Sequence, residues 1–134
     1  IERIFAFDPN HDPFAELFEQ TRGLTPFTYW DPPRDWWFNR MLRTPQPLQE
    51  RIALCWHDHF ATAGGKIWPP MRLHSQIDLF RRAGLGSFRE LLVAVGRDPA
   101  MLLWLDGVHS SKGAPNENYA REVMELFVLG EGHY

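Results

Sequence analysis

The stretch LQERIALCWHDHFATA, residues 48–63, decides the fold, because its apolar residues repeat with the period of a helix. The stripe occupies positions i, i+4, i+7, i+8, i+11, i+12 and i+15, which are Leu48, Ile52, Cys55, Trp56, His59, Phe60 and Ala63, and all of these except His59 are apolar. At roughly 100° per residue, these positions form one continuous stripe along a helix. We therefore expect a helix over residues 46–62 that turns this stripe toward the core, with His59 at its centre.

Helix starts elsewhere along the chain are marked by Asp-Pro pairs and by a capping box. An Asp side chain accepts the unpaired N–H groups of the first turn, and Pro suits the next position because no N–H is needed there. Such pairs indicate starts near Asp12, Asp31 and Asp98, and Ser87 with Glu90 forms a capping box. The expected helices cover residues 13–22, 32–43, 46–62, 70–82, 88–97, 99–105 and 116–129.

No segment alternates apolar and polar residues over a useful length, so we expect no strand. The predicted fold is all-α, an irregular bundle of about six or seven helices without a sheet. The length of 134 residues fits a single helical domain over residues 1–134. The aromatic fraction of 14% is high, and large rings fill a dense core or line a ligand groove.

The charge balance limits the classes of partner. A formal net charge of −3 argues against broad attraction to nucleic acid or to an anionic membrane. The longest apolar run, Ala100–Leu105, is far shorter than the ~18 residues of a membrane span. Cys55 is the single cysteine, which excludes an intramolecular disulfide and a multi-cysteine metal site. Two interpretations are open for the arginines that could still form a basic patch: a local patch of that kind, or a solvated helix face. These residues are Arg72, Arg81, Arg82 and Arg89.

His59 is the first candidate for chemistry. A polar ring within an apolar stripe needs a hydrogen-bond partner. Two interpretations stay open: a core histidine bonded to a main-chain carbonyl or a carboxylate, and a buried acid, base or ligand with a tuned pKa. His57 falls on the opposite side of the helix, where we expect it to be solvated. The two histidines therefore do not form a metal clamp.

The helix expected over residues 116–129 carries the second candidate group. Its apolar face is formed by Tyr119, Val123, Leu126 and Phe127. Beside that face, Asn118, Glu122 and Glu125 lie at i, i+4 and i+7 and make one polar strip. Two carboxylates one turn apart repel each other, so they favour a metal, an arginine such as Arg121, or a shared proton. The alternative is a charged helix edge with salt bridges.

Several motifs occur in an order that carries a resemblance to a known family. They are Trp36–Leu42, Cys55–Phe60, Gly84–Leu92, Arg97–Leu102, Lys112–Glu122, Met124–Phe127 and Leu129-Gly130. The chain resembles the bacterial domain of unknown function 1800 family over nearly all residues from about Trp36 onward. Cys55 departs from the family, where an aromatic residue is common, and Gly107-Val108-His109 replaces a more polar stretch.

This resemblance implies a helical fold and gives weight to the Trp-His and Asn-Glu-Asn segments, but it names no reaction. Family members are typically longer, bacterial, and often carry export signals. The resemblance thus implies that the chain is a truncated or excerpted part of a longer family domain. It also implies a bacterial source and, as in many relatives, export from the cell. The residues themselves leave the compartment open.

The first functional hypothesis is a hydrolase. His59 serves as general base or metal ligand, and Glu122 and Glu125 serve as acid, orienting group or further ligands. Asn118 completes the candidate catalytic set. The cofactor that this set suits is a divalent metal, and the substrate, a small molecule or a polymer, is not specified. A Ser/His/Asp triad is disfavoured, because no Gly-x-Ser-x-Gly elbow is present.

The second hypothesis is a helical oligomerisation or partner-binding module without catalysis. Apolar faces left uncovered drive association, and the candidate region contains Phe14, Phe18 and Trp36-Trp37. A third hypothesis, a redox or haem protein that uses His59, has no Cys-x-x-Cys-His motif to support it.

Overall fold

The computed structural model describes residue 8, residues 33–130 and residues 132 and 133. The α-helices in this part are α3 (Pro33–Arg43), α4 (Pro47–Phe60), α5 (Met71–Ala83), α6 (Phe88–Gly96), α7 (Pro99–Trp104) and α8 (Glu117–Glu122). A 3-10 turn, η1 (Gly107–His109), follows α7, and a π-helical turn, η2 (Val123–Val128), continues α8. In the described ranges there is no strand, only an isolated bridge between Ser111 and Ala114. The all-α prediction is confirmed.

The helices expected from residue 32 onward are all present, with ends that differ by at most two residues from the prediction. Asp98 caps α7 as expected, because its side chain accepts from the N–H of Met101 at 2.9 Å. The capping-box prediction was correct for the start of α6, which begins after Ser87. It was wrong for the hydrogen bond, because the Ser87 side chain makes no capping hydrogen bond. The helix expected over 13–22, with Phe14 and Phe18, lies outside the described residues.

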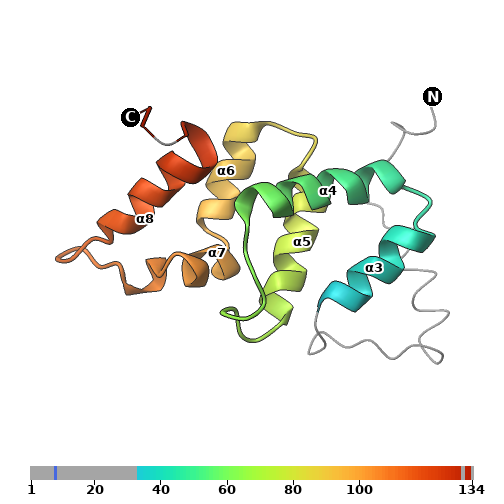
Figure 1. Cartoon of the computed structure of the whole chain (residues 1–134), viewed down its shortest axis with the longest axis horizontal. Coiled ribbons are helices and arrows are strands. Elements are labelled where there is room, and N and C mark those ends of the chain that lie inside the picture. Colours follow the sequence, from blue (N-terminus) through green and yellow to red (C-terminus); the bar gives the residue numbers. More distant parts are fainter. Residues whose placement is uncertain (1–7, 9–32, 131, 134) are drawn as a thin grey trace.

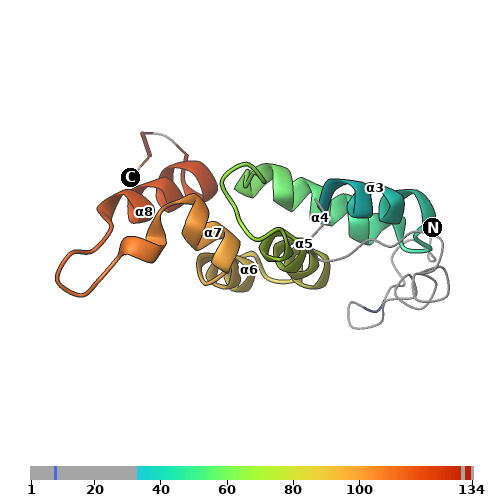
Figure 2. The same ribbon diagram turned by 90° about the horizontal axis from the view of Figure 1, so that it is seen from below.

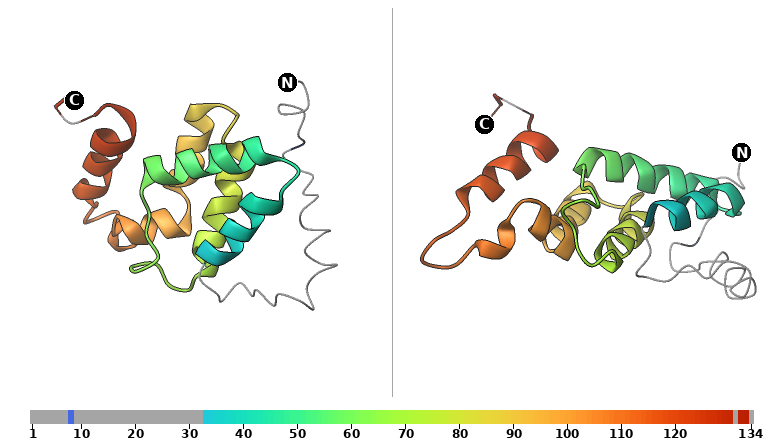
Figure 3. Two further views of the ribbon diagram at one scale, coloured as in Figure 1. Left: turned by 45° about the vertical axis from the view of Figure 1, so that its right-hand side comes forward. Right: turned by 60° about the horizontal axis from the view of Figure 1, so that its bottom comes forward.

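The helices form an elongated arrangement in which α3, α4 and α5 pack together at one end and α8 lies at the other (Figures 1 and 2). α6 and α7 lie between them and both pack against α5. Figure 3 shows α8 joined to the preceding turn by a protruding loop. η2 returns to the body and packs against α4. The end of α4 is therefore the place where the two parts of the fold meet.

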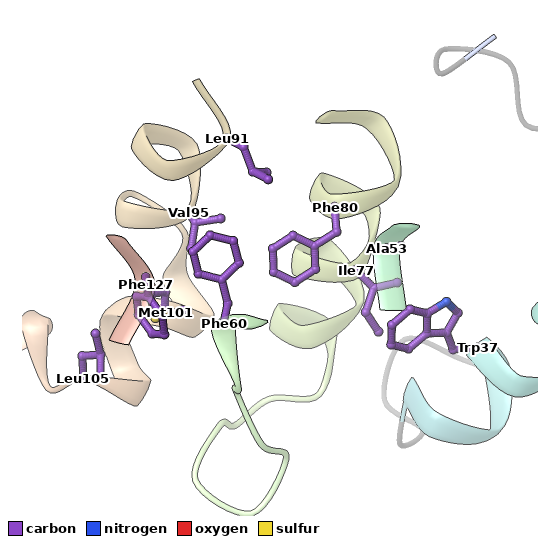
Figure 4. Packing of buried hydrophobic residues seen from close by; sticks show 10 residues of the cluster. All are labelled: Trp37, Ala53, Phe60, Ile77, Phe80, Leu91, Val95, Met101, Leu105 and Phe127. Carbon is purple, nitrogen blue, oxygen red and sulfur yellow. The ribbon is translucent and has the colours of Figure 1, made fainter. Parts of the chain in front are cut away.

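Phe60, the last residue of α4, lies at this meeting point (Figure 4). Its fully buried ring stacks on Phe80 of α5, with centroids 5.6 Å apart and planes 4° apart. On the other side it meets the ring of Phe127 of η2 edge-on, at 5.1 Å. The core around these rings consists of Trp37, Ala53, Ile77, Leu91, Val95, Met101 and Leu105.

The buried face of α4 differs from the predicted stripe. Its buried residues are Gln49, Glu50, Ala53 and Phe60, and His57 is half-buried. His59 and Cys55, which were expected on the core side, are exposed, and His57, which was expected in solvent, is turned inward. The prediction was wrong because it counted only apolar residues. Part of the buried face consists of polar side chains, Gln49 and Glu50, that are hydrogen-bonded to other helices.

A buried ion-pair cluster explains that polar face. Both Arg40 of α3 and Arg81 of α5 donate through Nε to Oε1 of Glu50, each at 2.8 Å, and all three side chains are at most 5% exposed. Trp37 donates through its indole N–H to Oε2 of Glu50 at 2.9 Å. We call these four residues the Glu50 cluster; it ties α3, α4 and α5 together. Because Arg81 is buried here, it does not belong to a surface basic patch.

A second buried polar chain fastens α7 to α5. Gln76 donates to Oδ2 of Asp98 at 2.7 Å and accepts a hydrogen bond from Thr62. Burial raises the pKa of the Asp98 carboxyl above its ordinary value, against the hydrogen bonds from Met101, Gln76 and Ala100, which lower it. Asp98 thus joins the start of α7 to the core as well as capping the helix.

Candidate functional site

His59 lies in the last turn of α4 and reaches the C-terminal helical segment. Its Nε2 is 3.0 Å from the main-chain oxygen of Phe127. A carbonyl oxygen can only accept, so Nε2 donates this hydrogen bond, and in the neutral imidazole Nδ1 then carries the lone pair. No described residue is hydrogen-bonded to Nδ1. The prediction of a buried histidine is wrong, because His59 is exposed, although its main-chain partner is one of the alternatives that the sequence left open.

Two further rings surround His59 and form with it what we call the aromatic patch: Trp56, His59 and Phe88. Trp56 stacks on Phe88 with centroids 5.7 Å apart and planes 21° apart. His59 meets Trp56 edge-on at 5.7 Å and Phe88 at 6.4 Å. Phe88 is 40% exposed and Trp56 is half-buried, so the patch is a surface feature at the junction of α4, α6 and η2.

The indole of Trp56 is held in place by the end of α5. Its Nε1 donates to the main-chain oxygen of Gly84 at 2.7 Å. A Cβ atom at Gly84 would meet the carbonyl of Phe80, and would lie 2.7 Å from Cδ1 of Trp56 and 2.9 Å from Cγ2 of Ile52. Glycine is therefore required for α5 to end so close to α4, and this close approach fixes the position of the patch.

The predicted acidic strip exists, and an arginine is its partner. Glu122 and Glu125 are partly buried, with side chains 26% and 21% exposed. Arg121 lies 3.9 Å from Glu122 and 4.0 Å from Glu125, and it also donates to Oδ1 of Asn118. This agrees with the interpretation of a charged helix edge. Within the described part of the chain, His59 makes no hydrogen bond with either carboxylate.

The metal hypothesis requires ligands that lie together. Among residues 8, 33–130, 132 and 133, no three His, Cys, Asp or Glu side chains form a group that could hold a metal ion. His59, Glu122 and Glu125 therefore do not make a three-ligand set in this arrangement. Asn118 is exposed.

His57 is a residue that sequence reasoning placed wrongly. Its ring lies 5.3 Å from Trp37 and 6.4 Å from Phe80, between α3 and α5. Its Nδ1 is buried and has no hydrogen-bond partner among the described residues. Burial lowers the pKa of His57 below its ordinary value of 6.5, partly offset by the charge of Asp58. The fold thus favours the neutral imidazole.

We expect His57 to make stability depend on pH. The unfolded chain takes up a proton near pH 6.5, whereas the folded chain takes it up only at lower pH. The contribution of His57 to the free energy of unfolding should therefore fall as the pH is lowered from 7.5 through 6.5 to 5.5. Urea titrations at these three pH values measure the fall, and His57→Gln should remove part of it. His59→Gln serves as the control, and an unchanged pH dependence in His57→Gln would contradict the expectation.

Comparison with known proteins places most of the chain in one family. A family model described as "Protein of unknown function (DUF1800)" matches residues 25–134. No curated protein and no solved structure gives a significant match. In the part of the chain that the structure describes, no helix has the length and apolar character needed to cross a bilayer.

Proposed function

The chain belongs to the family of unknown function DUF1800, whose description names no reaction, and we propose that it is a helical binding module that takes a partner on the aromatic patch. The observation that carries this proposal is that the three rings of the patch lie together at the surface, with the side-chain N–H groups of Trp56 and His59 already bonded inside the protein. The indole N–H of Trp56 is bonded to Gly84, and the imidazole N–H of His59 is bonded to Phe127.

A fixed aromatic surface suits binding for two physical reasons. Binding costs about 0.5–1.5 kcal/mol for each side chain that must be immobilised, and side chains that are already held avoid this cost. Trp is also enriched among the residues that dominate binding energy at interfaces. The apolar pair Phe38 and Leu42 of α3 is more exposed, at 59% and 69%, but no ring contact is found for either side chain within the described residues.

The adjacent η2 helix supports the same proposal. The apolar side of this helical segment is only partly covered by the rest of the protein. Phe127 at its centre is 4% exposed, whereas Leu126 is 56% and Val128 is 43% exposed. A helix with such a wide apolar arc is usually covered on more than one side. A partner that packs beside η2 would bury these flanks.

Disruption of the patch should weaken binding, and the test uses peptides selected from a random display library on the full chain. We expect peptides with micromolar affinity to lose about tenfold or more in Phe88→Asp, because a charge replaces a central ring. Val93→Asp is the matched control, because Val93 lies on the same helix, is 48% exposed and is not part of the patch. Failure to select any binder, or equal loss in both variants, would contradict the proposal.

Hydrolysis is a second candidate function, favoured by the orientation of His59. Its bond to Phe127 leaves Nδ1 as a basic nitrogen, which is what a general base requires. Glu122, Glu125 and Asn118 lie on the same C-terminal segment and are the proposed acid and orienting groups. A panel of ester, peptide and glycoside substrates tests this candidate. Turnover that His59→Ala abolishes would support it, and turnover unaffected by His59→Ala would refute it.

A further inference from the structure

The hydrogen-bonding inventory of the aromatic patch restricts what can bind there. The N–H of Trp56 and the Nε2–H of His59 are both used inside the protein, and Phe88 has no polar atom. Nδ1 of His59 is the one side-chain polar atom of the patch that has no hydrogen-bond partner among the described residues. The patch therefore offers one acceptor and no donor, surrounded by rings.

We propose that the patch binds an aromatic side chain that carries its own donor, the phenol of a tyrosine or the indole of a tryptophan in a partner polypeptide, with its O–H or N–H donated to Nδ1 of His59. This inference rests on the proposed binding function and adds the chemistry of the bound group. A ring fills the apolar surroundings, and offset or edge-to-face contacts between rings add to the burial of area. The donor satisfies the imidazole nitrogen that a purely apolar group would leave buried and unpaired.

Other ligand groups match this inventory less well. While the imidazole of His59 is neutral, a carboxylate or carbonyl oxygen would face the lone pair of Nδ1, because neither group has a proton to donate. A lysine ammonium has protons and is attracted to ring faces, but the patch contains no carboxylate that would compensate for the lost hydration of its charge. The phenol and the indole each combine an aromatic ring with a neutral hydrogen-bond donor. The ring matches the apolar surface of the patch, and the donor matches the acceptor Nδ1 of His59.

The test compares two small molecules, one with a hydroxyl donor and one in which a methyl group replaces the donated proton, titrated into the full chain by NMR. The probes are p-cresol and its O-methyl derivative, 4-methylanisole. We expect p-cresol to bind about 3- to 10-fold more tightly, the fold-change that corresponds to one net hydrogen bond. In His59→Phe, which keeps a ring but removes the acceptor, both probes should still bind and the preference should disappear. 3-Methylindole and 1,3-dimethylindole provide the same comparison for tryptophan.

The outcomes separate this inference from the proposed function. Equal binding of the two probes to the wild-type chain, or a preference that persists in His59→Phe, overturns the inference and leaves the patch as a binding surface. Tighter binding of n-butylammonium than of p-cresol overturns it in favour of a cationic group. Absence of binding by every probe at millimolar concentration overturns the inference and counts against the proposed function as well.

Discussion

Replacement of Glu50 with alanine should lower the free energy of unfolding by about 3–5 kcal/mol, the cost of removing one partner from a buried ion pair. The carboxylate of Glu50 accepts from Arg40 and Arg81, whose side chains are 3% and 5% exposed. Without it, the guanidinium groups of Arg40 and Arg81 lose the buried carboxylate that they share, although Arg81 keeps its ion pair with Asp78. The indole N–H of Trp37 loses its partner at the same time. Denaturation by urea at neutral pH measures the change.

The matched control for this substitution is Glu90→Ala. Glu90 is exposed on α6, and no ion pair or hydrogen bond of its side chain is found within the described residues. A surface change of this kind should stay within about 0.5 kcal/mol. A loss below about 1 kcal/mol in Glu50→Ala would mean that the Glu50 cluster does not hold α3 and α5 on α4.

Phe60→Ala should cost about 3–5 kcal/mol, because it removes a fully buried ring and leaves a cavity. The ring is the contact between Phe80 on one side and Phe127 on the other. Its loss should therefore also loosen η2, which carries the carbonyl that holds His59. Denaturation measures the stability, and amide hydrogen exchange over residues 123–128 measures the loosening.

Phe38→Ala provides the comparison for the loss of a ring at the surface. Phe38 is 59% exposed on α3, so we expect a change of about 0.5 kcal/mol or less. If Phe60→Ala left the exchange of residues 123–128 unchanged, the attachment of η2 would depend on contacts other than this ring.

Local signals in the sequence were sufficient to predict most of the helical fold. Asp98 and Asn116 cap α7 and α8 with their own side chains, so these starts follow from chemistry within three residues. Proline follows the cap in α7, where no N–H is needed. Helix starts that depend only on residues so close in sequence can be predicted without knowledge of the tertiary structure.

The orientation of α4 could not be predicted in the same way. Glu50, Ala53, His57 and Phe60 lie at a spacing of three and four residues and face the core together. Two of these are ionisable, so a count of apolar residues selected the neighbouring stripe instead. The partners that make burial of Glu50 possible come from helices ten and thirty-one positions away in sequence. Ala53, a small residue between Glu50 and His57 on the same helix face, was the available signal of a close helix contact.

The sequence hypothesis joined the imidazole of His59 to the carboxylates of Glu122 and Glu125. In the structure, His59 contacts the same C-terminal segment, but at Phe127. The contact is made by a main-chain oxygen, which side-chain patterns do not reveal. The participation of Phe88 was also not predicted, because its contact with Trp56 depends on how α6 packs beside the end of α4. Catalysis by His59 with Glu122 and Glu125 stays a prediction.

The most direct measurement is an NMR map of where a selected peptide binds to the full chain. If the aromatic patch is the binding surface, the largest shifts should occur at the indole N–H of Trp56, the ring of His59 and the ring of Phe88. The exposed side chains of Phe38 and Leu42 on α3 should shift little. Shifts centred on α3, with the three rings unaffected, would contradict the account.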